Sequence, residues 1–459
     1  MKTVLANISN SFFVRNFLRS DASKILLENG NIHLVLLSPK NKIDYYRKEF
    51  PDKLISFDIL PDVRNSKIER FFKFLETASI HTKTSYMLTK SQYLRRTGLK
   101  RARALSYIDF FERYILWHLG RFHFWRSMIR RAYSFFKNDE FRKILDIYNP
   151  DLVFLPSMIY SEDYVLARAA KKKKIKTLGM TLSWDNFYSK TLLMVPPDQL
   201  IVHTDRIVEQ AKKLGDFRGK IHVTGIPQYD IYFKRQNLMP RGEFFEKIGG
   251  DSSKKLLLYA FSGKSGLNIE FSVLEILYRA IKDKKIKDDV QVLLRPYPRY
   301  DFPKEKFDEL KEKYKFLIVQ PVFHTGEGKG DWEFNEDAVE LLANSLAHSD
   351  LVINMYSTFF IEAAIFDKPL VAIGFDGEKN FEYWNSAVRF FDWEHLAQIG
   401  KTNGIARAKN PDQLSEFINR CLSDPQWLGE GRRELVLQQC QFTDGKSGER
   451  LAKTILGAL

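Results

Sequence analysis

The segment from Asp350 to Phe375, DLVINMYSTFFIEAAIFDKPLVAIGF, constrains the fold of this chain more than any other. Its two apolar runs, Leu351–Met355 and Leu370–Phe375, have the length and composition of strands that are buried on both faces. Between them, a polar turn precedes a short helical stretch at Phe359–Phe366. The pattern predicts a strand, a turn, a helix and a second parallel strand, which is the repeating unit of an α/β protein.

The polar turn of this segment carries hydroxyl groups on Tyr356, Ser357 and Thr358. Hydroxyls and free backbone N–H groups would lie there at a helix N-terminus, where the helix dipole favours an anion such as phosphate. Glu362 follows one helical turn later, so its carboxylate could reach a sugar hydroxyl beside that anion. We therefore expect the turn to bind the diphosphate of a nucleotide and Glu362 to bind its ribose. A plain N-cap without a ligand is the alternative.

Strand and helix patterns alternate along both halves of the chain, and a length of 459 residues exceeds what one hydrophobic core usually serves. The expected strands are 3–8, 32–38, 54–57, 152–156, 176–182 and 199–203, then 255–261, 290–295, 316–319, 351–354 and 370–373, with an early helix at 17–29. Two such series predict two doubly wound Rossmann-like α/β domains that face each other across a cleft. The predicted domains are residues 1–236 and 237–447, with a C-terminal helix, 448–459, that packs on the first domain.

The composition is that of a folded protein, with 44% hydrophobic and 28% charged residues. No apolar run approaches the roughly 20 residues needed to cross a bilayer, and the N-terminal apolar stretch is too short for a secretory signal. Cys421 and Cys440 lack the spacing of a disulfide framework or a zinc site, and the nine histidines include no H-x-x-x-H pair. These features predict a cytoplasmic protein that uses neither a metal ion nor a cofactor.

The net charge of +15 is concentrated in one window of the first domain, from Ser91 to Lys137. This basic aromatic window contains eleven Lys or Arg residues, two acids and twelve aromatic residues, at a spacing that predicts a helical insert. Basic groups beside an aromatic face suit an anionic membrane surface. An ordinary helical pair with core aromatics and solvated arginines explains the pattern equally well. Nucleic acid, which also uses aromatic stacking and arginine, is the least favoured partner.

Two further strand ends in the second domain carry groups that suit phosphate. One strand runs into Ser262, Gly263 and Lys264, where small residues permit close backbone approach and the lysine can neutralise charge. Another ends at Arg295, whose guanidinium can bind phosphate through two parallel hydrogen bonds. A turn without a ligand is the alternative for the first strand end, and a salt bridge is the alternative for Arg295.

A polar loop of twelve residues, His324–Asn335, precedes a helix that is expected to begin near Glu336. Loops of this length in a compact domain are often functional. Trp332 or Phe334 could pack against a nucleobase, although a lid or a plain surface loop fits the sequence as well.

In the first domain, a polar cluster follows the strand that is expected to end at Leu182. Asp185 could take a proton from an attacking hydroxyl, Trp184 could stack on a sugar ring, and Asn186 could bind the hydroxyls of that sugar. The alternative is an Asx-turn that caps the next segment.

The loop after the first strand is expected to face the same cleft. It contains Ser11, Arg15 and Asn16, which we expect to contribute to acceptor binding.

Together these residues resemble the GT-B glycosyltransferases, in particular the branch that contains CDP-glycerol glycerophosphotransferase-like enzymes and non-hydrolysing UDP-N-acetylglucosamine 2-epimerases. The matching sequence marks are Ser183–Asn186, Val223–Pro227 with Asp230, Tyr356–Ala364, a late strand expected at Asn403–Ile405, and Asp444–Ser447. The resemblance implies that the second domain binds the nucleotide donor, that the first binds the acceptor, and that no metal is required. It also assigns Ser357 and Thr358 to the diphosphate and Glu362 to the ribose.

The chain departs from this resemblance at two places. The histidine-glycine motif of the glycerophosphotransferases is not evident, and Ser183–Asn186 stands in its place. The paired glutamates of the epimerases are reduced to Glu362, which Ile361 precedes. The second departure counts against an epimerase.

We therefore expect a metal-independent glycosyltransferase that moves a sugar from a nucleotide-sugar donor to a surface-polysaccharide or lipid-linked acceptor, as in capsule or lipopolysaccharide synthesis. The alternatives are a polyol-phosphate transferase, a nucleotide-sugar 2-epimerase, and a non-catalytic nucleotide- or glycan-binding protein. The expected location is the cytoplasm, with peripheral contact to the inner face of the membrane if the basic aromatic window binds lipid.

Overall fold

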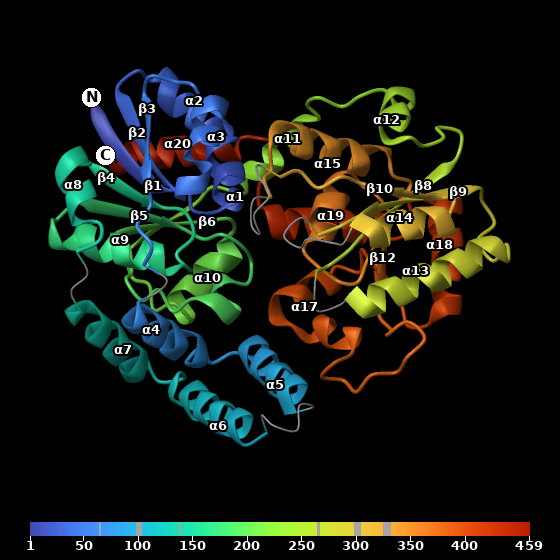
Figure 1. The fold of residues 1–459 in the computed structure, drawn as a ribbon, viewed down its shortest axis with the longest axis horizontal. Coiled ribbons are helices and arrows are strands. Elements are labelled where there is room, and N and C mark those ends of the chain that lie inside the picture. The colour runs from blue at the N-terminus through green and yellow to red at the C-terminus, as the bar shows by residue number, and fades with distance from the viewer. Residues whose placement is uncertain (64–65, 98–102, 137–138, 264–266, 298–303, 325–331) are drawn as a thin grey trace. The chain divides into compact units, whose positions relative to one another are not determined.

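The computed structural model describes residues 1–63, 66–97, 103–136, 139–263, 267–297, 304–324 and 332–459 (Figure 1). The chain divides into two compact units. Unit 1 contains Met1–Asp230 together with Cys440–Leu459, and unit 2 contains Ile231–Gln439. The predicted phosphate group Lys264 lies outside the described residues.

Unit 1 is built on a seven-stranded parallel sheet in the order β3-β2-β1-β4-β5-β6-β7. Its strands are β1 (Lys2–Asn7), β2 (Ile32–Ser38), β3 (Ile55–Ile59), β4 (Leu152–Leu155), β5 (Lys176–Met180), β6 (Gln199–Val202) and β7 (Lys220–Val223). The central strands are almost wholly apolar because helices cover both faces of the sheet (Figure 1). In the register of β1 with β2, for example, Val4 pairs with Leu34, and both side chains are fully buried.

The helices of unit 1 connect these strands and add a separate layer. They are α1 (Ser11–Phe13), α2 (Asp21–Glu28), α3 (Ile43–Glu49), α4 (Lys67–Ala78), α5 (Lys83–Thr97), α6 (Arg103–Leu119), α7 (His123–Phe135), α8 (Arg142–Tyr148), α9 (Ser161–Lys172), α10 (Asp205–Lys213) and α20 (Ser447–Ala458). The basic aromatic window covers the C-terminal half of α5, from Ser91, and all of α6 and α7. Figure 1 shows these three helices in a layer outside α4.

Unit 2 has a six-stranded parallel sheet in the order β10-β9-β8-β11-β12-β13. Its elements are α11 (Asp230–Lys234), α12 (Arg241–Ile248), β8 (Lys255–Ala260), α13 (Leu267–Lys282), β9 (Val290–Arg295), α14 (Lys304–Lys313), β10 (Leu317–Val319), α15 (Glu336–His348), β11 (Leu351–Asn354), α16 (Phe359–Ile365), β12 (Leu370–Ile373), α17 (Glu394–Gly400), β13 (Ala406–Ala408), α18 (Pro411–Ser423) and α19 (Gly429–Cys440). Both sheets have the doubly wound order, so the predicted class of two Rossmann-like α/β units is confirmed.

Three details of the predicted elements were wrong. The helix expected at 17–29 is broken, because a π-helical turn ends at Leu18 and the Ser20 hydroxyl then caps α2. The edge strand β7 was missed, because its residues Lys220–Val223 are only partly buried and lack a continuous apolar run. The last strand, expected at Asn403–Ile405, lies instead at β13, since Asn403 has a positive φ of 55°.

The C-terminal helix α20 belongs to the core of unit 1. Leu451, Ala452 and Ile455 are fully buried within the cluster that also contains residues of β1, β2 and α2. The Asp230 carboxylate accepts hydrogen bonds from the backbone N–H groups of Ser447 (3.0 Å) and Gly448 (2.7 Å), which stabilises the first turn of the helix. The Val223–Asp230 sequence mark therefore has a structural role in joining the two ends of unit 1.

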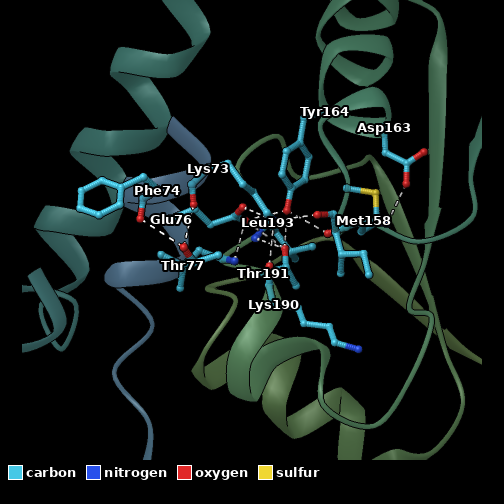
Figure 2. Close-up of polar contacts among 12 residues, drawn as sticks. Lys73, Phe74, Glu76, Thr77, Met158, Asp163, Tyr164, Lys190, Thr191 and Leu193 are labelled. Atoms are coloured by element: carbon cyan, nitrogen blue, oxygen red, sulfur yellow. Dashed lines mark hydrogen bonds and ion pairs between the residues drawn. The ribbon is translucent and has the colours of Figure 1, made fainter. Parts of the chain in front are cut away.

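The helix α4 is fixed to the rest of unit 1 by a buried carboxylate (Figure 2). Glu76 is fully buried, and its Oε1 accepts hydrogen bonds from the Tyr164 hydroxyl (2.6 Å) and the Leu192 backbone N–H (3.0 Å). The Lys73 ammonium lies 2.7 Å from Glu76 Oε2 and also donates to the carbonyls of Ile159 and Lys190. The buried carboxylate of Glu76 therefore has a counter-charge, on the partly exposed Lys73, as well as hydrogen-bond donors from the protein.

Candidate functional site

The predicted donor residues of unit 2 follow strands whose C-terminal ends lie at one edge of the sheet. The strand order reverses between β8 and β11, and ligands of doubly wound sheets bind outside the strand ends at this switch point. Ser262 follows β8, and Tyr356–Thr358 follow β11. Arg295 is the last residue of β9, the other neighbour of β8.

A hydrogen-bonded chain connects the ends of β8 and β11. The Asn354 side-chain amide donates to the Ala260 carbonyl at 2.7 Å, and the Ser262 hydroxyl donates to Asn354 Oδ1 at 3.4 Å. The Ser262 backbone N–H donates to Glu270 Oε1 at 2.6 Å. Gly263 follows with a φ of 118°, a conformation that favours glycine. Side chains from β11 and α13 therefore hold Ser262, the first residue of the predicted phosphate loop, in place.

Glu270 is a member of this chain that the sequence reasoning missed. Its side chain is fully buried, and within the described ranges its Oε2 has no hydrogen-bond partner. Burial raises the pKa of the Glu270 carboxyl to about 8, although hydrogen bonds from Ser262 act in the opposite direction. The sequence did indicate that Glu270 would be buried, because it lies on the same helical face as Val273, Leu274 and Leu277, which are buried.

The raised pKa of Glu270 predicts a pH-dependent stability. Between its ordinary pKa of 4.5 and about pH 8, Glu270 is ionised in the unfolded chain but protonated in the folded one. The unfolded state then binds fewer protons, so the free energy of unfolding falls as pH rises, by up to about 1.4 kcal/mol per pH unit. Urea unfolding at pH 5, 6.5 and 8 should show Glu270→Gln gaining stability relative to the wild type as pH rises. Parallel profiles for the two proteins would contradict the assignment.

Arg295 lines a pocket that is formed entirely by unit 2. The pocket is also lined by Pro296, residues 320–323 after β10, and Glu333, Phe334 and Ala338 near the start of α15. Gln320 and Glu333 are buried, and Gln320 Oε1 has no hydrogen-bond partner among the described residues. The Arg295 guanidinium lies 5.3 Å from the ring centroid of Phe359, the first residue of α16. The structure therefore places a cation beside both the pocket and the start of α16.

Some of the polar groups predicted to bind an anion at the start of α16 already form hydrogen bonds within the protein. The Ser357 hydroxyl accepts a hydrogen bond from the Phe359 backbone N–H at 3.2 Å, which is the geometry of the plain N-cap alternative. The buried Tyr356 donates its hydroxyl to the Leu396 carbonyl, and its ring stacks on Phe391 at 4.0 Å. Thr358 makes no side-chain cap. The anion-binding assignment of this turn stays a prediction.

Glu362 is nearly buried in α16. Its Oε2 accepts a hydrogen bond from the Tyr232 hydroxyl at 2.9 Å. This tyrosine, on α11, was not part of the sequence prediction. A ribose contact through Glu362 stays a prediction, and Tyr232 would orient the carboxylate that makes it.

In unit 1, the predicted base Asp185 lies just after β5. Its Oδ1 accepts a hydrogen bond from the Ser183 hydroxyl and forms an ion pair with the Lys190 ammonium at 2.9 Å. The side chain of Asp185 is 19% exposed and that of Lys190 is 37% exposed, so solvent and other molecules can approach both. A π-helical turn at Asn186–Lys190 brings the lysine back to the carboxylate.

The two neighbours of Asp185, Trp184 and Asn186, are buried and make their contacts within the protein. Trp184 is buried and stacks on Tyr229, with ring centroids 6.2 Å apart. Asn186 Oδ1 accepts from the Ser183 backbone N–H (2.9 Å), and its Nδ2 donates to the Ser157 carbonyl (3.1 Å). Both bonds join Asn186 to residues that precede it, so they are not the Asx-turn of the alternative, in which the oxygen accepts from the backbone two residues later. An acceptor could bind the Asn186 amide only by exchanging these bonds.

The predicted acceptor loop after β1 contains one group that the sequence did not indicate. Lys42 is buried, and its ammonium donates to the Ser11 hydroxyl at 3.2 Å. The Arg15 guanidinium lies 5.6 Å from the ring centroid of Phe12. Asn16 is buried, and no residue that the structure describes forms a hydrogen bond with its Oδ1. These residues adjoin the switch point between β1 and β4, but their role in acceptor binding stays a prediction.

A second buried carboxylate at this edge of unit 1 was also missed. Asp163, at the start of α9, accepts hydrogen bonds from Asn7 Nδ2 at 2.9 Å, from the Ser157 hydroxyl, and from the Met158 backbone N–H at 3.1 Å. Burial raises the pKa of Asp163 to about 6, although the hydrogen bonds lower it. Asn7 ends an otherwise apolar strand, which was the available signal. The network joins the ends of β1 and β4.

Comparison with solved structures identifies the fold. The S. aureus MnaA–UDP structure matches with a TM-score of 0.57 and 11% identity, over 100% of this chain and 98% of that one. The UDP-GlcNAc 2-epimerase from Neisseria meningitidis bound to UDP-GlcNAc matches with 0.56 and 10%, over 100% of both chains. The wall teichoic acid polymerase TagF matches with 0.53 and 13%, over 100% and 88%. At these identities the similarity establishes the fold, which is that of the GT-B enzymes.

The family is narrower than the fold. Residues 198–457 match the model of the family described as CDP-glycerol:poly(glycerophosphate) glycerophosphotransferase. The match covers more than half of the chain, so the chain belongs to this family and is a transferase. The predicted resemblance to this branch is confirmed. No curated protein matches the sequence at a significant level.

Proposed function

We propose that this protein transfers the activated group of a nucleotide-linked donor to a hydroxyl group of a surface-polysaccharide or lipid-linked acceptor. The observation that carries the proposal is the family match at residues 198–457, because it includes all of unit 2 and every predicted donor residue. In this assignment unit 2 binds the donor and unit 1 binds the acceptor.

The donor would bind at the switch point of unit 2. Arg295 supplies the positive charge for the diphosphate, and the ordered Ser262–Gly263 loop permits close backbone approach. We assign the nucleobase to the pocket beside Arg295, because Phe334 offers an apolar wall and Gln320 Oε1 is a buried acceptor for which the described part of the chain provides no partner. Electrostatic stabilisation of the departing phosphate is the main demand of this chemistry, and Arg295 is placed to meet it.

The transferred group has two candidates, and they differ in the bond that breaks. In sugar transfer the acceptor oxygen bonds to the anomeric carbon, the bond from that carbon to the phosphate oxygen breaks, and a nucleoside diphosphate leaves. In polyol-phosphate transfer the acceptor oxygen bonds to the distal phosphorus, the phosphoanhydride breaks, and a nucleoside monophosphate leaves. Asp185 would take the acceptor proton in both cases.

We favour sugar transfer, because the family match begins at residue 198 and leaves out Ser183–Asn186, which replaces the histidine-glycine motif. The family description itself favours polyol phosphate as the second candidate. An epimerase is disfavoured, because Ile361 stands where the resemblance would place a second glutamate beside Glu362.

Nucleotide release tests these candidates in one experiment. The protein is incubated with UDP-, GDP- and CDP-linked donors, including CDP-glycerol, with and without a glycan acceptor, and the released nucleotide is identified. An acceptor-dependent diphosphate supports sugar transfer, and an acceptor-dependent monophosphate supports polyol-phosphate transfer. Conversion of the donor sugar without acceptor would identify an epimerase, and binding without consumption would overturn the proposal. A chelating agent should leave the rate unchanged.

Arg295→Ala should weaken nucleotide binding by roughly 10- to 100-fold, because a charge-assisted contact to the diphosphate is lost. Isothermal titration with the nucleotide identified above measures the change. Arg279→Ala is the matched control, since this arginine of α13 pairs on the surface with Glu378 and lies outside the pocket. Equal affinities for the two variants would contradict the donor assignment.

Among the described residues, no helix combines the length and apolarity needed to cross a bilayer. We propose that the protein acts in the cytoplasm, where nucleotide-linked donors are available. With a lipid-linked acceptor, the reaction takes place at the inner face of the cytoplasmic membrane.

A further inference from the structure

The helix α6 presents an apolar face to solvent. Tyr107, Ile108, Phe111 and Ile115 are 60%, 54%, 53% and 44% exposed. At 100° per residue these positions fall within one sector of about 100° on the helix. The opposite side is used for packing: the Phe110 ring lies 4.7 Å from that of Tyr93 on α5. The exposed side chains therefore take no part in packing α6 against α5.

The helix α7 repeats this arrangement. Phe124, Met128 and Phe135 are 64%, 47% and 82% exposed, and their spacing places them on one side. Ile129 and Tyr133 are buried on the other side. Two successive helices thus each expose an apolar face, and large exposed apolar areas on a soluble monomer mark interaction sites. We call the seven exposed residues of α6 and α7 the apolar stripe.

The arginines near the apolar stripe fall into two groups: some pair within the protein, and others are exposed. Arg126 and Arg130 form ion pairs with Asp216 at 2.6 and 2.9 Å, so they hold α7 to unit 1 rather than facing a partner. Arg121 and Arg131 are exposed: Arg121 lies in the turn just before α7, and at 100° per residue Arg131 borders the sector of Phe124, Met128 and Phe135. Exposed positive charge at the border of an apolar face is the arrangement of a helix that lies in the interface of an anionic bilayer.

We propose that the apolar stripe, with Arg121 and Arg131, docks this protein on an anionic lipid bilayer, with α6 and α7 lying along the surface. Figure 1 shows both helices in the outer layer of unit 1, on the far side of α4 from the sheet. A nucleic acid is disfavoured as the occupant, because Ile108, Ile115 and Met128 cannot stack on bases. The inference deepens the proposed function, since a lipid-linked acceptor lies in the same surface, but its physical basis is independent of the reaction.

Vesicle flotation of the full-length protein tests this inference without donor or acceptor, so failure of the proposed function would leave the readout unchanged. The protein should float with phosphatidylcholine vesicles that contain phosphatidylglycerol and much less with phosphatidylcholine alone. Phe124→Ser with Phe135→Ser should lower the partition coefficient by roughly tenfold or more. Leu437→Ser on α19, 58% exposed, is the matched control and should float like the wild type.

A second pair of variants tests how much Arg121 and Arg131 contribute to membrane binding. Arg121→Gln with Arg131→Gln should lower partitioning onto anionic vesicles roughly tenfold, whereas Lys212→Gln with Lys213→Gln on α10 removes the same charge elsewhere and should change it little. Circular dichroism and unfolding midpoints check that the variants are folded. Equal flotation of stripe variants and controls would overturn the inference. So would equal binding to neutral and anionic vesicles, or a wild-type dimer that the phenylalanine variants convert to a monomer without lipid.

Discussion

Asp185→Asn should lower kcat by roughly 10²- to 10⁴-fold, while the affinity for nucleotide stays within about twofold of the wild type. Asparagine has nearly the shape of aspartate and can still accept a hydrogen bond from Ser183, but it cannot take a proton from the acceptor hydroxyl. The nucleotide is assigned to unit 2, so removing the Asp185 charge should leave its binding intact. Turnover at saturating donor and acceptor, with titration of the nucleotide, separates the two effects.

Asp205→Asn provides a matched control for this prediction. Asp205 is an exposed aspartate of the same unit, at the start of α10, and it accepts a hydrogen bond from Gln441. Its replacement should leave kcat close to the wild-type value. Near-normal turnover of Asp185→Asn would remove the base assignment, and loss of nucleotide binding would show that the residue acts on the donor instead.

Glu76→Ala should lower the free energy of unfolding by about 3–5 kcal/mol, because it leaves the Lys73 ammonium without its buried counter-charge. The Tyr164 hydroxyl and the Leu192 backbone N–H lose an acceptor in the same change (Figure 2). Since Glu76 is fully buried, water cannot readily replace these interactions. Urea unfolding followed by tryptophan fluorescence measures the loss.

Asp146→Ala is the control for the buried ion pair. Asp146 pairs with Lys173 on the surface, where its side chain is 54% exposed, and such pairs contribute about 0–1 kcal/mol. Hydrogen exchange gives a second readout, because α4 is the helix that α6 and α7 pack against. Glu76→Ala should speed amide exchange in α4, α6 and α7 more than in β1 and β2. A stability loss no larger than that of Asp146→Ala would contradict the anchoring role of Glu76.

Much of the fold could be predicted because its signals are local. Strands such as β2 and β8 are apolar runs, and a parallel sheet covered by helices requires that composition on both faces. The failures also have local causes. β7 is a partly buried edge strand, and Ser20 starts a new helix through a hydroxyl cap that lies inside an apparently continuous helical pattern.

The candidate site was less predictable, because its partners come from distant parts of the chain. Glu362 could be identified as a carboxylate near a helix start, but its contact with Tyr232 spans 130 residues. Asn186 could be identified as a polar residue after a strand. The hydrogen bond that its side-chain amide donates to the Ser157 carbonyl could not be predicted, because it depends on where the fold places Ser157. Glu270 could have been found from its helical period, whereas its raised pKa depends on the burial that packing produces.

The sequence by itself determined the α/β class, the strand-end positions of Ser262, Arg295 and Asp185, and the basic aromatic character of residues 91–137. These properties follow from periodicity and composition, which are local to each segment and do not depend on the rest of the fold. The tertiary structure decided which charges are used internally, as Arg126 and Arg130 are by Asp216, and which apolar side chains are left exposed, as Phe111 and Phe135 are. Burial and pairing are properties of the packed chain, because each depends on groups that the sequence places far away.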